Sequence, residues 1–263
     1  MIGGAINDFP SFPPECRLAM TTNYLQMMCV GCLCLTMVGK LNAQEAIGQR
    51  PVVRIAMAGD STMATYKTPP ADRPSLTGWG QVLGEFFNDS VRVSNHAQSG
   101  ASSKSFRAGG LWERVLASQP DYVFIQFGHN DSPGKGDRST DPKTEFRDNL
   151  RRFIDEAAEI DARVVLITPV SRRTFDAAGR ISSSLQPYVD AVLAVGGEKH
   201  VPVIDLNKSS TELFNQLGEA GSADLGPAAN DRSHFSRKGA LAIAKLVVDA
   251  IPSAVPELEL SIK

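Results

Sequence analysis

From residue 52 onward, short apolar runs rich in β-branched residues alternate with longer amphipathic stretches, and this alternation constrains the fold more than any other feature. The runs are almost continuously apolar, as expected of strands covered by helices on both faces. Strand–helix alternation gives right-handed crossovers and therefore a parallel sheet. Five strands are predicted, at residues 52–58, 91–95, 122–127, 164–168 and 201–206.

The amphipathic stretches predict helices at residues 80–88, 111–117, 144–160, 185–198, 209–217 and 237–250. In the third of these, Phe146, Leu150 and Phe153 fall on one apolar stripe with charges opposite. Ser236 is a predicted N-cap for the last helix, and Pro252 is expected to follow its end. Five such strands favour a flavodoxin-like doubly wound order, in which ligands bind beyond the carboxyl ends of the strands.

Two short polar motifs at opposite ends of this region suggest nucleophilic catalysis. Gly59–Thr62 follows the first strand, and Asp231–His234 precedes the last helix. A serine hydroxyl is a weak nucleophile at neutral pH, so it needs a base, and the base needs an orienting group. Ser61 is the candidate nucleophile, with His234 as base and Asp231, three residues earlier, as orienter. Each motif alone is also an ordinary turn or helix-cap composition.

Two further pieces follow the second and third strands. Asn95-x-Ala97 leads to Gly100, and Gly128-His129-Asn130-Asp131 closes the third apolar run. The Gly100 backbone N–H and the Asn130 side-chain amide are the kind of donors that hold a developing oxyanion. With the serine and histidine motifs, they make acyl transfer the leading hypothesis. The loops at 67–77, 133–142 and 220–232 are polar and are expected to line the crevice.

Competing interpretations of these residues are weaker. Asp60 could be an aspartyl nucleophile, but it lacks the second aspartate that such phosphotransfer sites usually carry. A two-metal phosphoesterase needs carboxylates and histidines at several strand ends, which this pattern does not offer. We therefore expect neither a metal nor a cofactor. The other three histidines, His96, His129 and His200, are predicted to be structural or exposed, and Trp79 to be a packing aromatic.

The chain has 263 residues and a formal net charge of −2, which argues against a general nucleic-acid-binding protein. Residues 24–38 form an uncharged, mostly apolar stretch, and Leu41-Asn42-Ala43 resembles a cleavage site. Residues 1–43 are therefore predicted to be a signal peptide, with Met20 as an alternative start. An N-terminal helix or membrane anchor is the other interpretation.

This assignment has consequences for the mature protein. All four cysteines, Cys16, Cys29, Cys32 and Cys34, lie in the N-terminal segment, so the mature chain would have no disulfides. We expect residues 44–263 to form one catalytic domain, secreted or periplasmic, without stable membrane insertion.

Taken together, the four blocks resemble those of the SGNH (GDSL-type) hydrolase superfamily. The matching pieces are Gly59-Asp60-Ser61, Asn95 to Gly100, Gly128-x-Asn130-Asp131 and Asp231-x-x-His234, in the family's order. Within it, the Gly78-Trp79-Gly80 turn, Gln126 to Asp131 and His234-Phe235 look like the rhamnogalacturonan acetylesterases. The resemblance implies a flavodoxin-like three-layer α/β/α sandwich with a five-stranded parallel sheet, the SGNH hydrolase fold.

The resemblance also implies roles for individual residues. Ser61 would be the nucleophile, His234 the base and Asp231 its orienter, with an oxyanion hole from the Ser61 N–H, the Gly100 N–H and the Asn130 side chain. The implied reaction removes acetyl groups from an acetylated pectic polysaccharide. Relatives often carry a basic residue directly after the block-two glycine, where this chain has Ala101; Lys104 or Arg107 could substitute for it.

Three hypotheses from different classes remain open. The first is a secreted carbohydrate O-deacetylase acting on rhamnogalacturonan. The second is a lipase, thioesterase or other acyl esterase, which would need an apolar acyl groove. The third is a non-catalytic binding protein of the same fold. The polar loops at 69–77, 132–141 and 222–232 favour the first hypothesis over the second.

Overall fold

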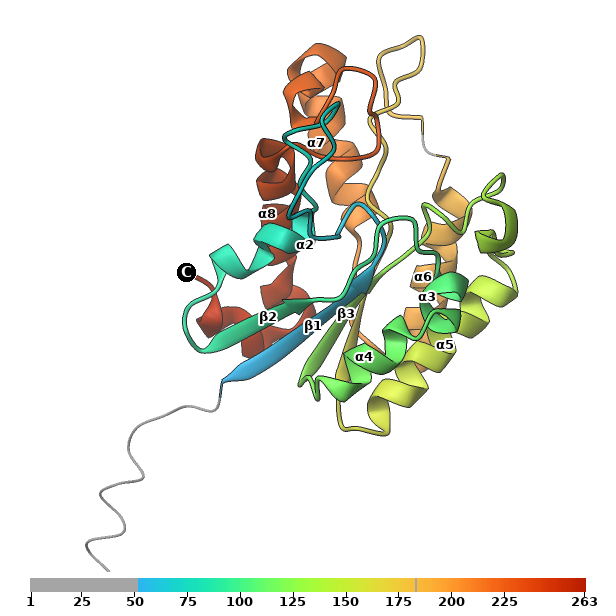
Figure 1. Ribbon diagram of the computed structural model, residues 1–263, viewed down its shortest axis with the longest axis vertical. Coiled ribbons are helices and arrows are strands. Elements are labelled where there is room, and N and C mark those ends of the chain that lie inside the picture. The colour runs from blue at the N-terminus through green and yellow to red at the C-terminus, as the bar shows by residue number, and fades with distance from the viewer. Residues whose placement is uncertain (1–51, 183) are drawn as a thin grey trace, which may run out of the picture. The chain divides into compact units, whose positions relative to one another are not determined.

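Five parallel strands lie in the order β2-β1-β3-β4-β5, which is the flavodoxin-like order predicted from the sequence (Figure 1). The structure is a computed structural model that describes residues 52–182 and 184–263. The strands are β1 (Val53–Gly59), β2 (Val91–Asn95), β3 (Tyr122–Gln126), β4 (Arg163–Ile167) and β5 (Val203–Ile204). β1 pairs with β2 on one side and β3 on the other, so it lies inside the sheet.

Helices cover both faces of the sheet (Figure 1). One face carries α2 (Trp79–Val82), α7 (Leu206–Gly221) and α8 (Arg237–Ala254). The other carries α3 (Ser103–Ala108), α4 (Leu111–Ala117), α5 (Glu145–Ala158) and α6 (Gln186–Lys199). Successive side chains of β1 alternate between the two, with Ile55 and Met57 in the first core and Ala56 and Ala58 in the second. The three-layer sandwich expected from the resemblance is confirmed.

The predicted apolar stripe of α5 packs against the sheet. Phe146, Leu150 and Phe153 are almost completely buried. The Phe153 ring stacks on Phe127, with centroids 5.7 Å apart, and meets Trp112 edge-on at 4.6 Å. Burying a side chain of this size stabilises the fold by about 1.5–3 kcal/mol. This core supports β3, whose end leads into the Asn130 loop.

The predicted fifth strand is too long, and the predicted start of the helix after it too late. β5 ends at Ile204, because the Asp205 side chain accepts a hydrogen bond from the Lys208 backbone N–H, 3.1 Å away, and so caps α7. The chain therefore enters α7 at Leu206, where the apolar run had indicated continued strand.

Three helical segments also differ from the prediction. The stretch 80–88 splits into α2 and a 3₁₀ helix (Leu83–Phe86), because residues 86–88 bond to the C-terminal segment 261–263. α3 was not predicted; its six residues are too few for an apolar stripe, and a Ser102–Ser105 capping box starts it. Pro252 was predicted to follow the end of α8 but lies inside it, and the helix ends two residues later at Ala254, since a proline disfavours further helical turns. The remaining 3₁₀ helices are Gly136–Arg138, Ala223–Leu225 and Pro256–Ser261.

The described part of the chain belongs to one compact unit, residues 50–263. None of the helices within residues 52–182 and 184–263 is both long and apolar enough to span a membrane. The predicted signal peptide, the alternative start and the four cysteines lie outside the described residues.

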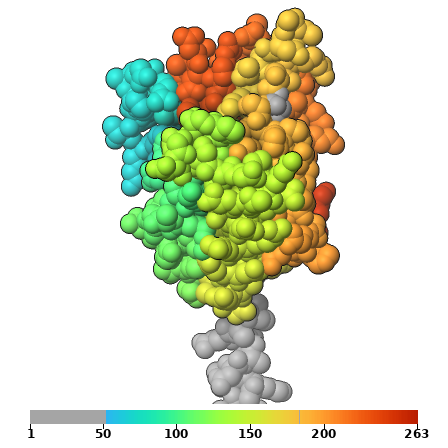
Figure 2. Space-filling model, turned by 90° about the vertical axis from the view of Figure 1, so that its right-hand side faces the viewer, coloured from blue at the N-terminus to red at the C-terminus, as the bar shows by residue number. Residues whose placement is uncertain are grey.

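The loops that carry the predicted site meet at one end of the sheet. Ser61 follows β1, Gly100 follows β2 and Asn130 follows β3. Figure 2 shows the cyan loop after β1 and the orange-red loop before α8 at the same end of the molecule. A β-bridge joins these two loops between Leu76 and Ser236. These loops lie beyond the carboxyl ends of the strands, where the sequence predicted the site.

Candidate active site

Ser61 is held in a tight turn directly after β1. Asp60 shapes this turn, since its Oδ1 accepts hydrogen bonds from the Thr62 N–H at 2.9 Å and from the Thr62 hydroxyl at 2.8 Å. The Asp60 carbonyl accepts from the backbone N–H groups of Met63 and Ala64. The turn leaves Ser61 at the sheet edge with 8% of its surface exposed. The Asp60 carboxylate is fully buried and holds the turn. This structural role disfavours Asp60 as the alternative nucleophile considered from the sequence.

The loop before α8 folds back on itself and brings Asp231 against His234. Asp231 Oδ1 accepts from the backbone N–H groups of Ser233 at 3.0 Å and His234 at 2.8 Å. The His234 ring lies with Nδ1 2.8 Å from Asp231 Oδ2 and Nε2 2.9 Å from the Ser61 hydroxyl oxygen. Ser236 then begins α8 by capping the Gly239 N–H.

These distances determine the tautomer of a neutral His234. A carboxylate can only accept, so the ring hydrogen lies on Nδ1 and is donated to Asp231. Nε2 is left with a free lone pair, which accepts a hydrogen bond from the Ser61 hydroxyl. The structure thus brings together all three residues predicted as nucleophile, base and orienter, in the geometry that a proton transfer from Ser61 to His234 requires.

Asp231 is held in its charged form. Burial disfavours its charge, but hydrogen bonds from His234 and Ser233 and the His234 charge outweigh burial and lower its pKa to about 2. Because this pKa lies below the ordinary 3.8, the carboxylate stabilises the fold above about pH 4, and that contribution is lost as the pH falls toward 2. Arg73 adds an ion pair, with Nη1 3.2 Å from Asp231 Oδ2.

A buried arginine anchors the loop from behind. Arg173, 2% exposed, donates from Nη2 to the Asp231 carbonyl at 2.6 Å and to the His234 carbonyl at 2.8 Å. Its guanidinium packs over the rings of Phe235 and Phe214. Burial lowers the pKa of Arg173 to about 10, which leaves it protonated at neutral pH. One side chain therefore fixes the backbone of both the orienter and the base.

The nucleophile loop and the base loop are also joined through their backbones. The Thr77 N–H donates to the Phe235 carbonyl at 2.9 Å, and the Trp79 N–H donates to the Thr62 carbonyl at 3.0 Å. Ser61 and His234 lie 173 residues apart in sequence. The distance between Ser61 and His234 is therefore set by these main-chain hydrogen bonds, one between the two loops and one within the nucleophile loop. The hydrogen bond between the two side chains adds to them.

The predicted oxyanion donors lie beside Ser61 in the same cavity. Gly100 has a φ of +81°, which only glycine adopts readily, and this turns the backbone after β2. Within the described part of the chain, the backbone N–H groups of Ser61 and Gly100 donate to no acceptor. Asn130 Nδ2 donates one hydrogen to the Ala101 carbonyl at 3.0 Å, so its second hydrogen remains available.

Asp131 organises the loop that presents Asn130. This fully buried carboxylate accepts hydrogen bonds from Ser103, from the Gly128 N–H and from the Thr140 hydroxyl. Burial raises its pKa to about 6 against the opposing effect of these donors. The sequence motif had indicated Asp131 only as part of block three; its function in the structure is to tie the loop after β3 to α3.

The cavity in front of Ser61 has a volume of about 440 Å³. Polar and charged residues supply most of its lining, and Leu76 is its one large aliphatic side chain; the full set is Ser61, Tyr66, Thr68, Pro70, Arg73, Leu76, Ser99, Gly100, Asn130, Lys135, Arg138 and His234. Two of the predicted polar loops, 67–77 and 133–142, therefore contribute to the crevice. The individual side chains Tyr66, Arg73, Lys135 and Arg138 were not predicted, because loop residues carry no periodic signal.

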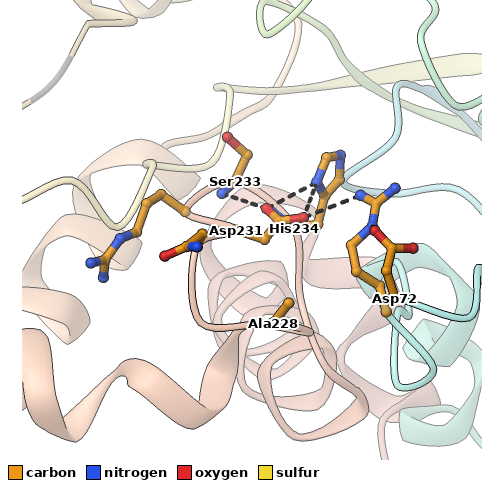
Figure 3. Close-up of a pocket in the computed structure, with 8 residues that line it drawn as sticks. Asp72, Ala228, Asp231, Ser233 and His234 are labelled. Atoms are coloured by element: carbon orange, nitrogen blue, oxygen red, sulfur yellow. Dashed lines mark hydrogen bonds and ion pairs between the residues drawn. The ribbon is translucent and has the colours of Figure 1, made fainter.

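Tyr66 contacts the nucleophile directly. Its hydroxyl donates to the Ser61 carbonyl at 2.8 Å, and burial raises the pKa of the phenol. A second cavity, of about 460 Å³, shares Arg73 and His234 with the first. Figure 3 shows Asp231, a residue of the third predicted loop, in this second cavity, hydrogen-bonded to His234 and to Ser233.

The remaining sequence predictions concern residues outside this chemistry. His129 is buried, and burial lowers its pKa to about 4; its Nε2 lies 3.0 Å from the Val170 carbonyl. Trp79 is fully buried and donates to Gln126 at 3.0 Å, as expected of a packing aromatic. His200 ends α6 in a left-handed conformation, and His96 is half-buried. Within the described ranges, no three His, Cys, Asp or Glu side chains group as metal ligands would.

Comparison with known proteins identifies relatives of this chain. The chain is 39% identical over 213 residues to the rhamnogalacturonan acetylesterase RhgT of Bacillus subtilis (strain 168), covering 76% of this chain and 89% of that relative. The crystal structure of the Bacillus subtilis protein YxiM superposes with a TM-score of 0.66 at 32% identity. That match covers 81% of this chain but 58% of the YxiM chain, so this chain spans little more than half of it.

A more distant structure shares the fold. The acetylxylan esterase Axe2 from Geobacillus stearothermophilus matches with a TM-score of 0.59 at 20% identity, covering 78% of this chain and 94% of that chain. The model of the GDSL-like lipase/acylhydrolase family matches residues 57–242, which include every residue of the site described above. The resemblance to the SGNH (GDSL-type) hydrolases is confirmed. The chain belongs to the GDSL-like lipase/acylhydrolase family.

Proposed function

We propose that this protein is a secreted carbohydrate esterase that removes O-acetyl groups from a pectic polysaccharide, rhamnogalacturonan, through an acetyl-enzyme on Ser61. The observation that carries the proposal is the hydrogen-bonded series from Ser61 through His234 to Asp231. It opens on a polar cavity with little aliphatic surface. The similarity to RhgT supports the choice of substrate.

In the first half of the reaction, the Ser61 hydroxyl oxygen attacks the acetyl carbonyl carbon while its proton passes to His234 Nε2. Negative charge develops on the carbonyl oxygen, and the N–H groups of Ser61, Gly100 and Asn130 stabilise it. The ester bond then breaks. The sugar oxygen leaves with the proton from Nε2, and the acetyl group stays on Ser61.

In the second half, water attacks the acetyl-enzyme and gives its proton to His234. A second tetrahedral intermediate forms, stabilised by the same donors. The bond between the acetyl carbon and the Ser61 oxygen then breaks, Ser61 takes the proton back from His234, and the acetic acid that leaves ionises to acetate. Asp231 remains ionised throughout and stabilises the imidazolium that forms in each half.

The cavity favours a short acyl group. Each buried methylene of a longer chain would gain about 0.8 kcal/mol only if apolar surface received it. Leu76 is the only large aliphatic side chain in the lining, while Arg73, Lys135 and Arg138 would lie beside such a chain. A lipase-like substrate is therefore disfavoured, although the family includes lipases.

The test measures acetate release from acetylated rhamnogalacturonan and acetylated xylan, and hydrolysis of p-nitrophenyl esters from acetyl to octanoyl. We expect acetate from rhamnogalacturonan at the highest kcat/KM among the polymers, and a flat or declining series with acyl length. Ser61→Ala supplies the background rate. A kcat/KM that climbs with chain length, together with no acetate from pectin, would replace the proposal with the lipase alternative.

Secretion rests on the apolar segment at residues 24–38 and the small residues before Gln44. Expression of the full chain in a secreting host, followed by N-terminal sequencing of the exported protein, tests it. Gln44 is the expected first residue. An exported protein that retains the apolar segment would support a membrane anchor.

A further inference from the structure

The cavity in front of Ser61 is positively charged. Among the residues that the structure describes, its lining contains Arg73, Lys135 and Arg138 and no aspartate or glutamate. An acetylated neutral sugar offers no anion to such a surface, whereas a polymer with uronic acid units offers a carboxylate on each of them. The inference drawn here deepens the proposed function, on which it rests, by naming the residues that recognise the acid.

Arg138 occupies a particular place in this cavity. It lies in the loop after β3, and its Nη1 donates to the Gly100 carbonyl at 2.8 Å. A Cβ placed on Gly100 would lie 3.2 Å from the same nitrogen. The guanidinium therefore packs directly against Gly100, whose N–H is a predicted oxyanion donor.

The two cations considered from the sequence as substitutes have other partners. Lys104 pairs with Glu145 at 3.2 Å, and Arg107 pairs with Glu156 at 2.6 Å. Neither lines the cavity. Arg138 reaches Gly100 from a different loop and thereby puts a positive charge beside the predicted oxyanion donors.

Arg138 and Lys135 have no anionic partner of their own. In the part of the chain that the structure describes, neither lies within 4.0 Å of a carboxylate. Arg73, by contrast, already pairs with Asp231. Arg138 is exposed and Lys135 half-buried, so both can meet a ligand that enters the cavity.

We propose that Arg138, assisted by Lys135, forms a subsite that binds a uronate carboxylate of the acetylated polymer. A guanidinium matches the planar geometry of a carboxylate and binds it through charge-assisted hydrogen bonds. Because Arg138 also contacts Gly100, this subsite positions the acidic polymer relative to the oxyanion donors. It makes Arg138 a specificity-determining residue for acidic over neutral substrates.

The experiment compares one polymer in two forms. Acetylated rhamnogalacturonan is used as it is and after reduction of its carboxyl groups to alcohols, and the ratio of the two kcat/KM values is measured. We expect the wild-type enzyme to prefer the acidic form. Arg138→Gln, which keeps an N–H donor but loses the charge, should lower that ratio by roughly threefold to tenfold, mainly through KM.

Lys104→Gln is the matched control, since it removes a nearby exposed charge that does not line the cavity, and its ratio should equal that of the wild type. Added salt should lower the wild-type ratio more than the Arg138→Gln ratio. Lys135→Gln should lower the ratio less than Arg138→Gln. Hydrolysis of p-nitrophenyl acetate verifies that each variant is folded and active.

Two results would overturn the subsite alone: equal wild-type activity on both polymers, or equal losses by Arg138→Gln on both. The second result would mean that Arg138 positions Gly100 and does not bind a carboxylate of the substrate. If the wild-type enzyme hydrolyses p-nitrophenyl acetate but releases acetate from neither polymer, the proposed polysaccharide substrate falls and the subsite falls with it.

Discussion

Arg73 Nη1 lies 3.2 Å from Asp231 Oδ2, the same oxygen that lies 2.8 Å from His234 Nδ1. A single carboxylate oxygen is thus shared by a guanidinium and an imidazole. Arg73 and His234 therefore both hold the Asp231 carboxylate, which is the last group of the hydrogen-bonded series that begins at Ser61.

Arg73→Gln should lower kcat on p-nitrophenyl acetate by roughly threefold to tenfold, because the Asp231 side chain loses a charged partner that helps to hold it against His234. Rates at one neutral pH measure the effect, and thermal unfolding verifies that the variant is folded. Arg232→Gln, which removes a charge paired with Glu219, is the control and should behave as wild type. An unchanged kcat in Arg73→Gln would contradict this role of Arg73.

Ser61→Ala should lower kcat by about 10⁴-fold or more while leaving the fold intact, because the change removes one oxygen atom from a turn held by Asp60. Steady-state rates on p-nitrophenyl acetate and the thermal midpoint measure the two effects. Ser75→Ala, an exposed serine of the same loop, should keep both near the wild-type values. More than about one percent of the wild-type kcat in Ser61→Ala would remove Ser61 from the mechanism.

Asn130→Ala should lower kcat by about 10²–10³-fold with KM nearly unchanged, since an oxyanion donor acts mainly in the transition state. The free hydrogen of Nδ2 motivates this expectation. The comparison is Asn230→Ala, an exposed amide that lines the second cavity and is expected to behave as wild type. An effect confined to KM would make Asn130 a ligand of the bound substrate instead.

Arg173→Met should destabilise the protein by about 1–3 kcal/mol, because two part-buried carbonyls lose their donor. It should also lower kcat by roughly tenfold at temperatures where the variant is folded, since the Asp231 and His234 backbones are no longer fixed. Thermal unfolding and kcat at low temperature separate the effects. Compared with Arg173→Met, Arg173→Lys should restore part of the stability and part of kcat. Arg180→Met is the control for the loss of an exposed charge. Lost stability with unchanged kcat would limit Arg173 to a structural role.

The sequence predicted the parts of this protein that follow from repeated patterns. Strands β1 to β4 are near-continuous apolar runs, and the Phe146–Phe153 stripe has the helical period, so both are visible without tertiary information. The short motifs at strand ends then located Ser61, Gly100 and Asn130 at one edge, because parallel strands place their carboxyl ends together.

Features that depend on tertiary contacts were not predictable in the same way. β5 ends early because Asp205 caps α7, and residues 86–88 leave the helix because the C-terminal segment bonds to them. Arg73, Arg138 and Arg173 reach the site from loops whose paths no local pattern determines. An arginine in a polar loop looks the same in sequence whether it faces solvent, a triad carboxylate or a buried carbonyl.

The hydrogen bond from the Thr77 N–H to the Phe235 carbonyl joins the nucleophile loop to the base loop. A backbone amide in such a bond exchanges its hydrogen with solvent only when the bond opens. The exchange rate of this one amide therefore measures the free energy of opening the backbone contact between the loops that carry Ser61 and His234, without any substrate present. Substitutions that loosen the site would appear as faster exchange at Thr77, whereas substitutions that change only the chemistry would leave that rate alone.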